Sequence, residues 1–221
     1  PSVTKWIRVL YNQASSSVLV NGFLSESFQI GRGCRQGDGL SPYLFLLCAE
    51  VLSMLVCNDK ILEGIKVEGT EFRISQYADD TVLFLNGTEK SLQAAFKILD
   101  LFASMSGLKV NIEKTNAIWV GSKKGCGEKL CEEIKVNWVE DEHIFKILGI
   151  EFSTDLNSTV LLNYNRVICS IRGQIFNWSK RHLTVLGRIA VVKSLLLSKL
   201  TYLVLTIPDP PCNMIKELNT M

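Results

Sequence analysis

The sequence lacks the features that mark fibrous, disordered and membrane-spanning chains. Its 221 residues hold only 5 prolines and no short period or biased run, which excludes collagen, coiled-coil and low-complexity classes. No uninterrupted apolar run reaches the about 18 residues that a membrane span needs. The best stretch, Val185 to Ile207, contains Arg188, Lys193 and Lys199. No secretory signal is visible, and the first residue is Pro1. We expect an intracellular domain, in nucleus or cytoplasm, with no membrane partner, cut from a longer chain.

Cysteine pairing is also poorly supported. The 7 cysteines are odd in number and irregularly spaced, and several lie in apolar runs, which is typical of reduced cysteines in a reducing compartment. Cys126 and Cys131, followed by His143, could form half of a zinc site. Their spacing and ligand number fit such a site poorly, so ordinary cysteines are favoured.

Acidic residues are missing from one long segment. Between Leu156 and Pro208 there is no Asp or Glu, although the whole chain has a net charge of only +2. The basic residues of this segment are Arg166, Arg172, Lys180, Arg181, Arg188, Lys193 and Lys199. Such a concentration of positive charge predicts a surface that faces phosphates, with an ordinary solvated basic face as the alternative.

What is present is a chain with 47% hydrophobic residues, enough for a packed core. Asn21-Gly22 predicts a hairpin turn, and Ser41-Pro42 predicts the start of a helix that is apolar all round and therefore buried. Strand patterns follow over 64–85, and Thr88 and Gly107 are expected to cap a helix. Short strands are expected near 117–120 and 136–152, and helices from Leu156 to the prolines at 208–211. We expect an α+β fold to about residue 155, with a helical part behind it.

Asp79 and Asp80 lie side by side between two apolar strand patterns. On a regular strand they would point to opposite faces, but at a hairpin tip both can project the same way. Hard carboxylate oxygens suit Mg²⁺, which can activate a hydroxyl and neutralise a leaving pyrophosphate. On this dipeptide alone, a solvated Asp-Asp turn is the favoured interpretation.

The surrounding motifs extend the pattern. Tyr77-Ala78-Asp79-Asp80 resembles the aromatic-x-Asp-Asp motif of reverse transcriptases. Three further segments resemble motifs of that family in the family's order: Gly33-Cys-Arg-Gln-Gly-Asp-Gly-Leu-Ser-Pro42, Gly107-Leu-Lys-Val-Asn-Ile-Glu-Lys-Thr115 and Phe145-Lys-Ile-Leu-Gly149. Asn21-Gly22 and Trp178-x-x-Arg181-x-Leu-Thr184-x-x-Gly187-Arg188 are similar to the non-long-terminal-repeat, long interspersed element type.

This resemblance implies a partial right-hand polymerase palm at 1–155, an antiparallel sheet with packed helices, and a helical thumb at 156–221. It implies an RNA-directed DNA polymerase that uses Mg²⁺ or Mn²⁺, an RNA template, a DNA primer and deoxynucleoside triphosphates. The implied catalytic residues are Asp79 and Asp80, which also bind the metal, and Lys114, which lies near the triphosphate and protonates the leaving pyrophosphate. The other implied sites are nucleotide and template at Arg35, Gln36 and Gly37, the primer grip at Leu148 and Gly149, and nucleic-acid backbone at Arg181, Arg188 and Lys193. Gly39 stands where the family has proline.

One expected residue is missing. The family carries another aspartate on a strand before the glutamine motif, and the first residues, Pro1 to Gln13, contain no acid. We therefore expect the chain to be a polymerase fragment that is inactive, or nearly so, on its own. The alternatives are a catalytically dead remnant that binds nucleic acid and a small polymerase that takes its third carboxylate from a partner chain.

Overall fold

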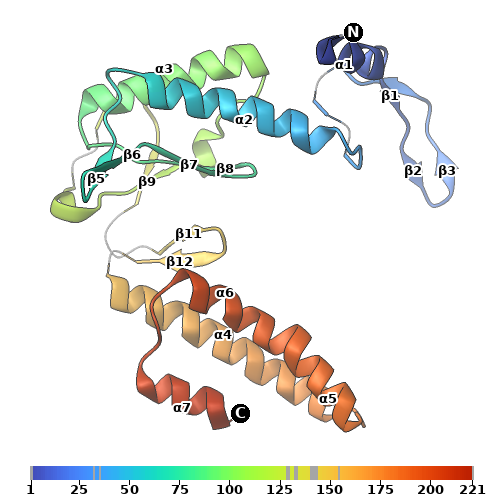
Figure 1. Cartoon of the computed structure of the whole chain (residues 1–221), viewed down its shortest axis with the longest axis vertical. Helices are drawn as coiled ribbons and strands as arrows, with labels where there is room; N and C mark the ends of the chain where they lie inside the picture. The colour runs from blue at the N-terminus through green and yellow to red at the C-terminus, as the bar shows by residue number, and fades with distance from the viewer. Residues whose placement is uncertain are drawn as a thin grey trace. The chain divides into compact units, whose positions relative to one another are not determined.

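The computed structural model describes residues 2–31, 33–34, 36–127, 130–131, 134–139, 144–153 and 155–220 (Figure 1). The chain divides into two compact units, Pro1–Val110 and Asn111–Met221. This division falls earlier than the predicted domain boundary at residue 155. The predicted boundary separates the α+β part from the helical part, and it stays a prediction.

The first unit joins small antiparallel strand pairs to helices. Its helices are α1 (Val3–Tyr11), α2 (Ser41–Asn58) and α3 (Glu89–Ser106). Its strands are β1 (Ser15–Ser16), β2 (Leu19–Val20), β3 (Phe23–Leu24), β4 (Phe28–Gln29), β5 (Ile65–Val67), β6 (Thr70–Phe72), β7 (Ile74–Tyr77) and β8 (Asp80–Leu83). The pairs are β1–β4, β2–β3, β5–β6 and β7–β8. The predicted turn at Asn21-Gly22 is confirmed, since both residues have positive φ between β2 and β3.

The helix ends follow the sequence signals in part. The Thr88 hydroxyl accepts the Ser91 N–H at the start of α3, and Gly107 ends it with φ 76°, as predicted. Ser41 is not the N-cap of α2, because Leu40 holds that place. The Asp38 carbonyl accepts the Ser41 N–H instead.

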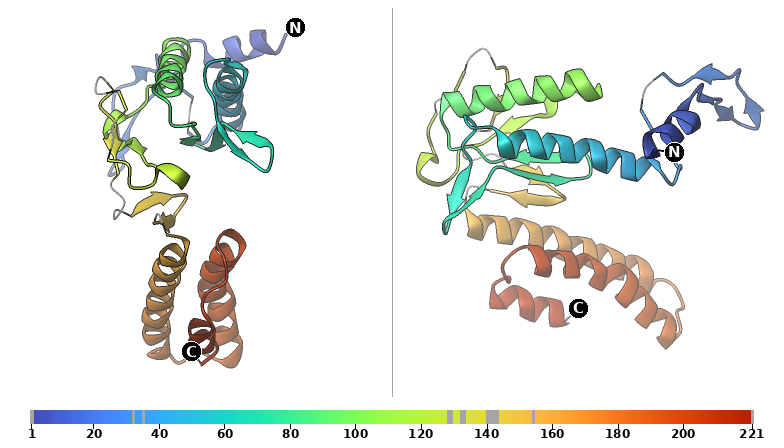
Figure 2. Two further views of the ribbon diagram at one scale, coloured as in Figure 1. Left: turned by 90° about the vertical axis from the view of Figure 1, so that its left-hand side faces the viewer. Right: turned by 45° about the horizontal axis from the view of Figure 1, so that its top comes forward.

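The core of the first unit lies between the two long helices and the β7–β8 pair. Its buried residues are Leu52, Val56, Leu62, Ala94, Ala95, Ile98 and Phe102. Ile74 and Leu83, which face each other across β7 and β8, pack against this core. Figure 2 shows α2 and α3 side by side over these strands. The two long helices and the β7–β8 pair therefore share one core.

The prediction that α2 is buried all round is wrong. Only Leu52 and Val56 are buried, while Tyr43, Leu46 and Leu47 are each more than 60% exposed. The reason is that the described elements of this unit cover only one side of the helix, the side that meets α3 and β7. The apolar character of the other side remains unmatched by any described neighbour in the unit.

Two helical stretches have the length and composition to cross a membrane, Ser41–Asn58 and Val185–Thr206. Charged residues interrupt both stretches, Glu50 in the first and Arg188, Lys193 and Lys199 in the second, yet their mean hydropathy reaches 1.5 and 1.6. Length and composition are weak evidence, since soluble core helices meet the same criteria. The absence of a membrane partner stays a prediction.

The second unit is mainly helical. Its helical segments are η1 (Ile112–Lys114), η2 (Gly121–Lys123), α4 (Leu156–Ser179), α5 (Val185–Val191), the π-helical η3 (Val192–Leu197), α6 (Ser198–Thr206) and α7 (Cys212–Thr220). Its strands are β9 (Asn116–Ala117), β10 (Asn137–Trp138), β11 (Phe145–Ile147) and β12 (Ile150–Phe152). β9 and β10 pair in parallel, and β11 and β12 form an antiparallel hairpin. Helix α7, behind the prolines, was not predicted.

A second core joins this hairpin to the helices. Its buried residues are Ile150, Val160, Tyr164, Ile168, Leu203, Ile207 and Met214. They come from β12, α4, α6, α7 and the residue after α6. Helices α4 and α6 lie side by side in both views (Figures 1 and 2). The predicted helical segment from Leu156 is therefore confirmed.

Candidate functional site

The two adjacent carboxylates lie at the tip of the β7–β8 hairpin, as predicted. Ala78 and Asp79 form the two-residue turn, and Asp80 opens β8 opposite Tyr77. Ala78 has φ 52°, a left-handed conformation that costs a non-glycine residue about 1 kcal/mol. The turn interrupts the strand, so that Asp79 lies in the turn and Asp80 at the first position of β8.

Both carboxylates are exposed. Within the described part of the chain, neither forms a hydrogen bond or an ion pair. Two neighbouring, unpaired carboxylates repel each other, and their hard oxygens suit a divalent cation such as Mg²⁺ or Mn²⁺. The described residues contain no group of three or more His, Cys, Asp or Glu side chains that could hold a metal. The pair fits part of a metal site.

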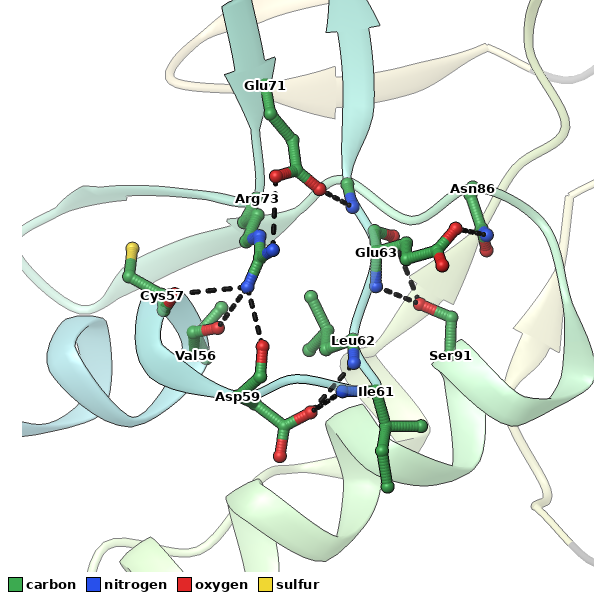
Figure 3. Close-up of polar contacts among 11 residues, drawn as sticks. Val56, Cys57, Asp59, Ile61, Leu62, Glu63, Glu71, Arg73, Asn86 and Ser91 are labelled. Atoms are coloured by element: carbon green, nitrogen blue, oxygen red, sulfur yellow. Dashed lines mark hydrogen bonds and ion pairs between the residues drawn. The ribbon is translucent and has the colours of Figure 1, made fainter.

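The base of this hairpin is held by Arg73, the residue before β7 (Figure 3). Its guanidinium donates to the carbonyls of Cys57 at 3.0 Å and Asp59 at 2.8 Å, at the end of α2. It also contacts the Val56 carbonyl and pairs with Glu71 at 3.0 Å. The last carbonyls of a helix have no partners within the helix, so a cation there satisfies them and the helix dipole together.

Glu71 completes this anchor. Its carboxylate accepts the Gly64 N–H at 2.7 Å, and this bond and the Arg73 guanidinium lower the pKa of Glu71. Gly64 has no room for a side chain, because a Cβ there would lie 2.1 Å from the Phe72 carbonyl oxygen. The base of the β7–β8 hairpin is thus closely packed, whereas Asp79 and Asp80 at its tip are exposed.

The glutamine motif precedes α2. Gln36 and Gly37 are exposed, and Gly37 has φ 85°, a conformation that favours glycine. The Tyr11 hydroxyl donates to the Asp38 carboxylate at 2.7 Å and so ties α1 to this loop. Arg35, predicted to contact nucleotide or template, lies outside the described residues, and so does His143 of the weak zinc hypothesis.

Lys114 belongs to the second unit and ends η1. The Asn111 side chain caps this turn by accepting the Lys114 N–H at 3.3 Å. The Thr115 hydroxyl donates to the Asn111 carbonyl at 2.8 Å. The motif residues Asn111 and Thr115 therefore shape the turn and leave the Lys114 side chain exposed. Its approach to a triphosphate stays a prediction.

The predicted primer grip is the turn of the β11–β12 hairpin. Leu148 has φ 48° and Gly149 φ 84°, so both turn residues are left-handed, as in the tight turns that suit twisted hairpins. The Tyr202 hydroxyl of α6 donates to the Leu148 carbonyl at 2.5 Å. The Arg166 guanidinium of α4 donates to the Gly149 carbonyl at 2.7 Å and pairs with Glu151.

Buried polar groups fix the same hairpin along β12. Asn163 is fully buried; its amide donates to the Glu151 carbonyl at 2.6 Å, and its oxygen accepts the Glu151 N–H at 2.9 Å. Thr159 similarly accepts the Ser153 N–H at 2.9 Å. Asn163 and Thr159 thus form the hydrogen bonds along the edge of β12 that a neighbouring strand would otherwise form.

In the folded chain, two cations of the basic segment have acidic partners from other segments. Arg166 pairs with Glu151, and Arg172 pairs with Glu217 at 2.6 Å, so acids from outside the segment compensate two of its charges. Lys199 donates to the Ser170 hydroxyl. The remaining cations are Lys180, Arg181, Arg188 and Lys193.

These four cations come from the end of α4 to η3. Lys180 lies 4.0 Å from the Phe176 ring centre and Arg181 4.8 Å from that of Trp178. Trp178 is half-buried under this guanidinium. Thr184 of the same motif caps α5 by accepting the Gly187 N–H at 3.2 Å. Arg181, Arg188 and Lys193 are all exposed, as a role at a phosphate backbone requires.

Sequence reasoning missed the residues that hold the two hairpins: Arg73, Asn163, Arg166 and Tyr202. A signal existed for Asn163, since it is a polar residue on the apolar face of α4 beside Val160 and Tyr164. No signal marked Arg73 or Tyr202, because each bonds to backbone carbonyls that any sequence provides.

Comparison with known proteins points to the same family as these motifs. The family model described as "Reverse transcriptase (RNA-dependent DNA polymerase)" matches residues 1–152. The "Transposon TX1 uncharacterized 149 kDa protein" of Xenopus laevis is 26% identical over 91% of this chain. The "Retrovirus-related Pol polyprotein from type-2 retrotransposable element R2DM" of Drosophila melanogaster is 31% identical over 67% of this chain. An uncharacterised mitochondrial protein of Arabidopsis thaliana is 37% identical over 47% of this chain and 88% of its own length.

The chain spans only 15% and 14% of the first two relatives, the Xenopus laevis and Drosophila melanogaster proteins. Their transposon and retrotransposable-element names agree with the predicted retrotransposon type. The match over 1–152 supports the α+β fold class, because it covers the strand pairs and the helices packed on them. With the family model matching more than two thirds of its residues, the chain belongs to the reverse transcriptase (RNA-dependent DNA polymerase) family.

Proposed function

We propose that this chain is the palm and thumb part of a reverse transcriptase from a non-long-terminal-repeat retrotransposon. In the parent protein it transfers deoxynucleotides to a DNA primer on an RNA template, inside the cell. The observation that carries the proposal is the exposed, unpaired pair Asp79–Asp80 on a strained hairpin tip, within the segment that the family model matches. We assign the palm to 1–155 and the thumb to 156–221.

The proposed roles follow the positions of the side chains. Asp79 and Asp80 hold divalent metal, with further ligands from outside the described residues. A bound Mg²⁺ or Mn²⁺ supplies the charge that activates a primer hydroxyl and neutralises departing pyrophosphate. Gln36 and Gly37 contact the incoming nucleotide and the template, and the Lys114 ammonium contacts the triphosphate. Arg35 has the same predicted role as Gln36, at a position that the structure does not describe.

The basic helical part is proposed to hold the template–primer duplex through its phosphates. Five cations of its acid-free segment have no acidic partner among the described residues: Lys180, Arg181, Arg188, Lys193 and Lys199. Lys199 donates to the Ser170 hydroxyl, which leaves the other four for phosphate contacts. Leu148 and Gly149 are proposed to contact the primer strand.

One observation favours a second candidate, a catalytically dead remnant that only binds nucleic acid. No third carboxylate joins Asp79 and Asp80 among the described residues. Primer extension separates the two candidates. The 221-residue chain is compared with the same chain carrying an upstream segment that includes the strand with the family's further aspartate. The polymerase proposal expects extension only from the longer chain. No extension from either, with binding intact, supports the remnant.

Binding of a duplex gives an independent test. Four phosphate contacts predict a slope of log affinity against log salt of about −3 to −4, because each contact releases counterions. The measurement is fluorescence anisotropy of a labelled template–primer at several salt concentrations. An affinity that does not change with salt contradicts the electrostatic role of this segment.

A further inference from the structure

The turn of the β11–β12 hairpin has both of its backbone carbonyls bound from the helices. The Leu148 carbonyl accepts from Tyr202, 54 residues later in the chain, and the Gly149 carbonyl accepts from Arg166. Donors from two different helices, α6 and α4, thus reach two consecutive peptide groups. A short turn whose residues both have positive φ has few ways to rotate once both carbonyls are held.

The orientation of one carbonyl determines that of a neighbouring N–H. The peptide bond between Leu148 and Gly149 is trans, so its C=O and N–H point in opposite directions. Because the Leu148 carbonyl points at Tyr202, the Gly149 N–H points away from that hydroxyl. A backbone N–H directed to the open side of a turn is a donor for a phosphate oxygen.

The hydrogen bonds to this turn extend into a wider network. Arg166 also pairs with the Glu151 carboxylate, and Asn163 holds the Glu151 backbone on both sides. Ile150 between them is buried in the core. The turn therefore moves with α4 and α6 and not as an independent loop.

We propose that Tyr202 and Arg166 are positioning residues of the primer grip: they turn the Leu148–Gly149 peptide so that the Gly149 N–H faces a phosphate near the primer terminus. This inference rests on the proposed function. It adds that the thumb helices set the position of the primer end through two hydrogen bonds to backbone carbonyls.

The test uses the 221-residue chain and an RNA template annealed to a DNA primer with 2-aminopurine as its last nucleotide. A second duplex carries 2-aminopurine in the interior of the primer. The variants are Tyr202→Phe, which removes only the hydroxyl, and Arg166→Gln. Their matched controls are Tyr164→Phe, whose hydroxyl is buried and without a hydrogen bond among the described residues, and Arg172→Gln, which removes the same charge from the same helix.

The unmodified chain is expected to change the fluorescence of the terminal probe at saturation. Tyr202→Phe and Arg166→Gln should lose most of this change and bind about threefold to tenfold more weakly, as expected for one hydrogen bond. Both control variants should keep the terminal signal. A thermal melt of each variant identifies loss of folding, which would alter the terminal and the interior probe alike.

Failure of the positioning role and failure of the proposed function give different results. If Tyr202→Phe and Arg166→Gln keep the terminal signal, or lose both signals equally while folded, the positioning role is wrong and the proposed function stands. If the unmodified chain does not bind the duplex, the proposed function fails and the positioning role fails with it.

Discussion

Two hairpins of the same design are held in opposite ways. Each has a two-residue turn that begins with a non-glycine residue at positive φ, Ala78 between β7 and β8 and Leu148 between β11 and β12. The β7–β8 hairpin is anchored at its base, where Arg73 binds the end of α2, and its tip carboxylates are free of partners within the described residues. The β11–β12 hairpin is bound at its tip by Arg166 and Tyr202.

The difference corresponds to the proposed work of each turn. A turn that offers carboxylate oxygens to a metal must leave them unpaired, because a bound arginine or N–H would compete with the cation. A turn that offers its backbone must instead have the peptide orientation fixed, since a backbone group cannot be re-aimed by a rotamer change. Rigidity is therefore placed at the base in one hairpin and at the tip in the other.

The largest expected effect tests the open tip. In the chain extended upstream, Asp79→Asn should lower primer extension by at least about three powers of ten, since removing one member of a cooperating site removes most of its rate. Asp100→Asn, at an exposed aspartate on α3, should leave the rate unchanged. Single-turnover extension assays measure both. Equal rates for Asp79→Asn and the unmodified protein would mean that this carboxylate has no catalytic role.

The next effect tests the buried support of the bound tip. Asn163→Ala leaves the N–H and C=O of Glu151 without partners and should destabilise the second unit by about 3 kcal/mol. Asn165→Ala, two residues away and exposed, is the matched control and should change stability little. Urea unfolding of both variants decides the point. Similar midpoints would show that Asn163 is not needed to hold β12.

A smaller effect tests the anchored base. Arg73→Gln removes the cation from the end of α2 and the partner of Glu71, and should cost about 2 kcal/mol of the first unit's stability. Lys66→Gln on neighbouring β5, an exposed cation, is the control. Hydrogen exchange should increase at the end of α2 and in β7 only for Arg73→Gln. Unchanged protection there would contradict the anchor.

The smallest effect compares the two units at acid pH. Hydrogen bonds from the Gly64 N–H and the Arg73 guanidinium lower the pKa of Glu71. Hydrogen bonds from the N–H and hydroxyl of Ser158, at the start of α4, lower the pKa of Asp155. Each carboxylate has a lower pKa folded than unfolded, so its stabilisation is present above the unfolded pKa of about 4 and is lost as pH falls through the folded value. Glu71→Gln and Asp155→Asn should each flatten this acid loss in urea titrations at several pH values. Glu68→Gln, at the exposed β5–β6 turn, should leave it unchanged.

The local elements and the family follow from patterns in the amino-acid sequence. The pattern apolar run, turn, apolar run placed Asp79 and Asp80 on a hairpin, and the caps Thr88 and Gly107 bounded α3. These features depend on residues close together in the chain, whose backbone preferences and alternation act over a few positions. The four motifs in family order likewise lie in the sequence itself, and the family match confirms the family that they indicate.

How those elements are held, and which of their faces stay exposed, depends on packing between segments that are far apart in the sequence. α2 has the composition of a buried helix, yet only the side toward α3 is covered, because burial depends on neighbours and not on composition. Two arginines of the acid-free segment pair with acids from outside it. The bond from Tyr202 to Leu148 crosses 54 residues of sequence and exists only because α6 packs beside α4 near the β11–β12 turn. Backbone carbonyls are the same at every residue, so only packing can select which of them receives a donor.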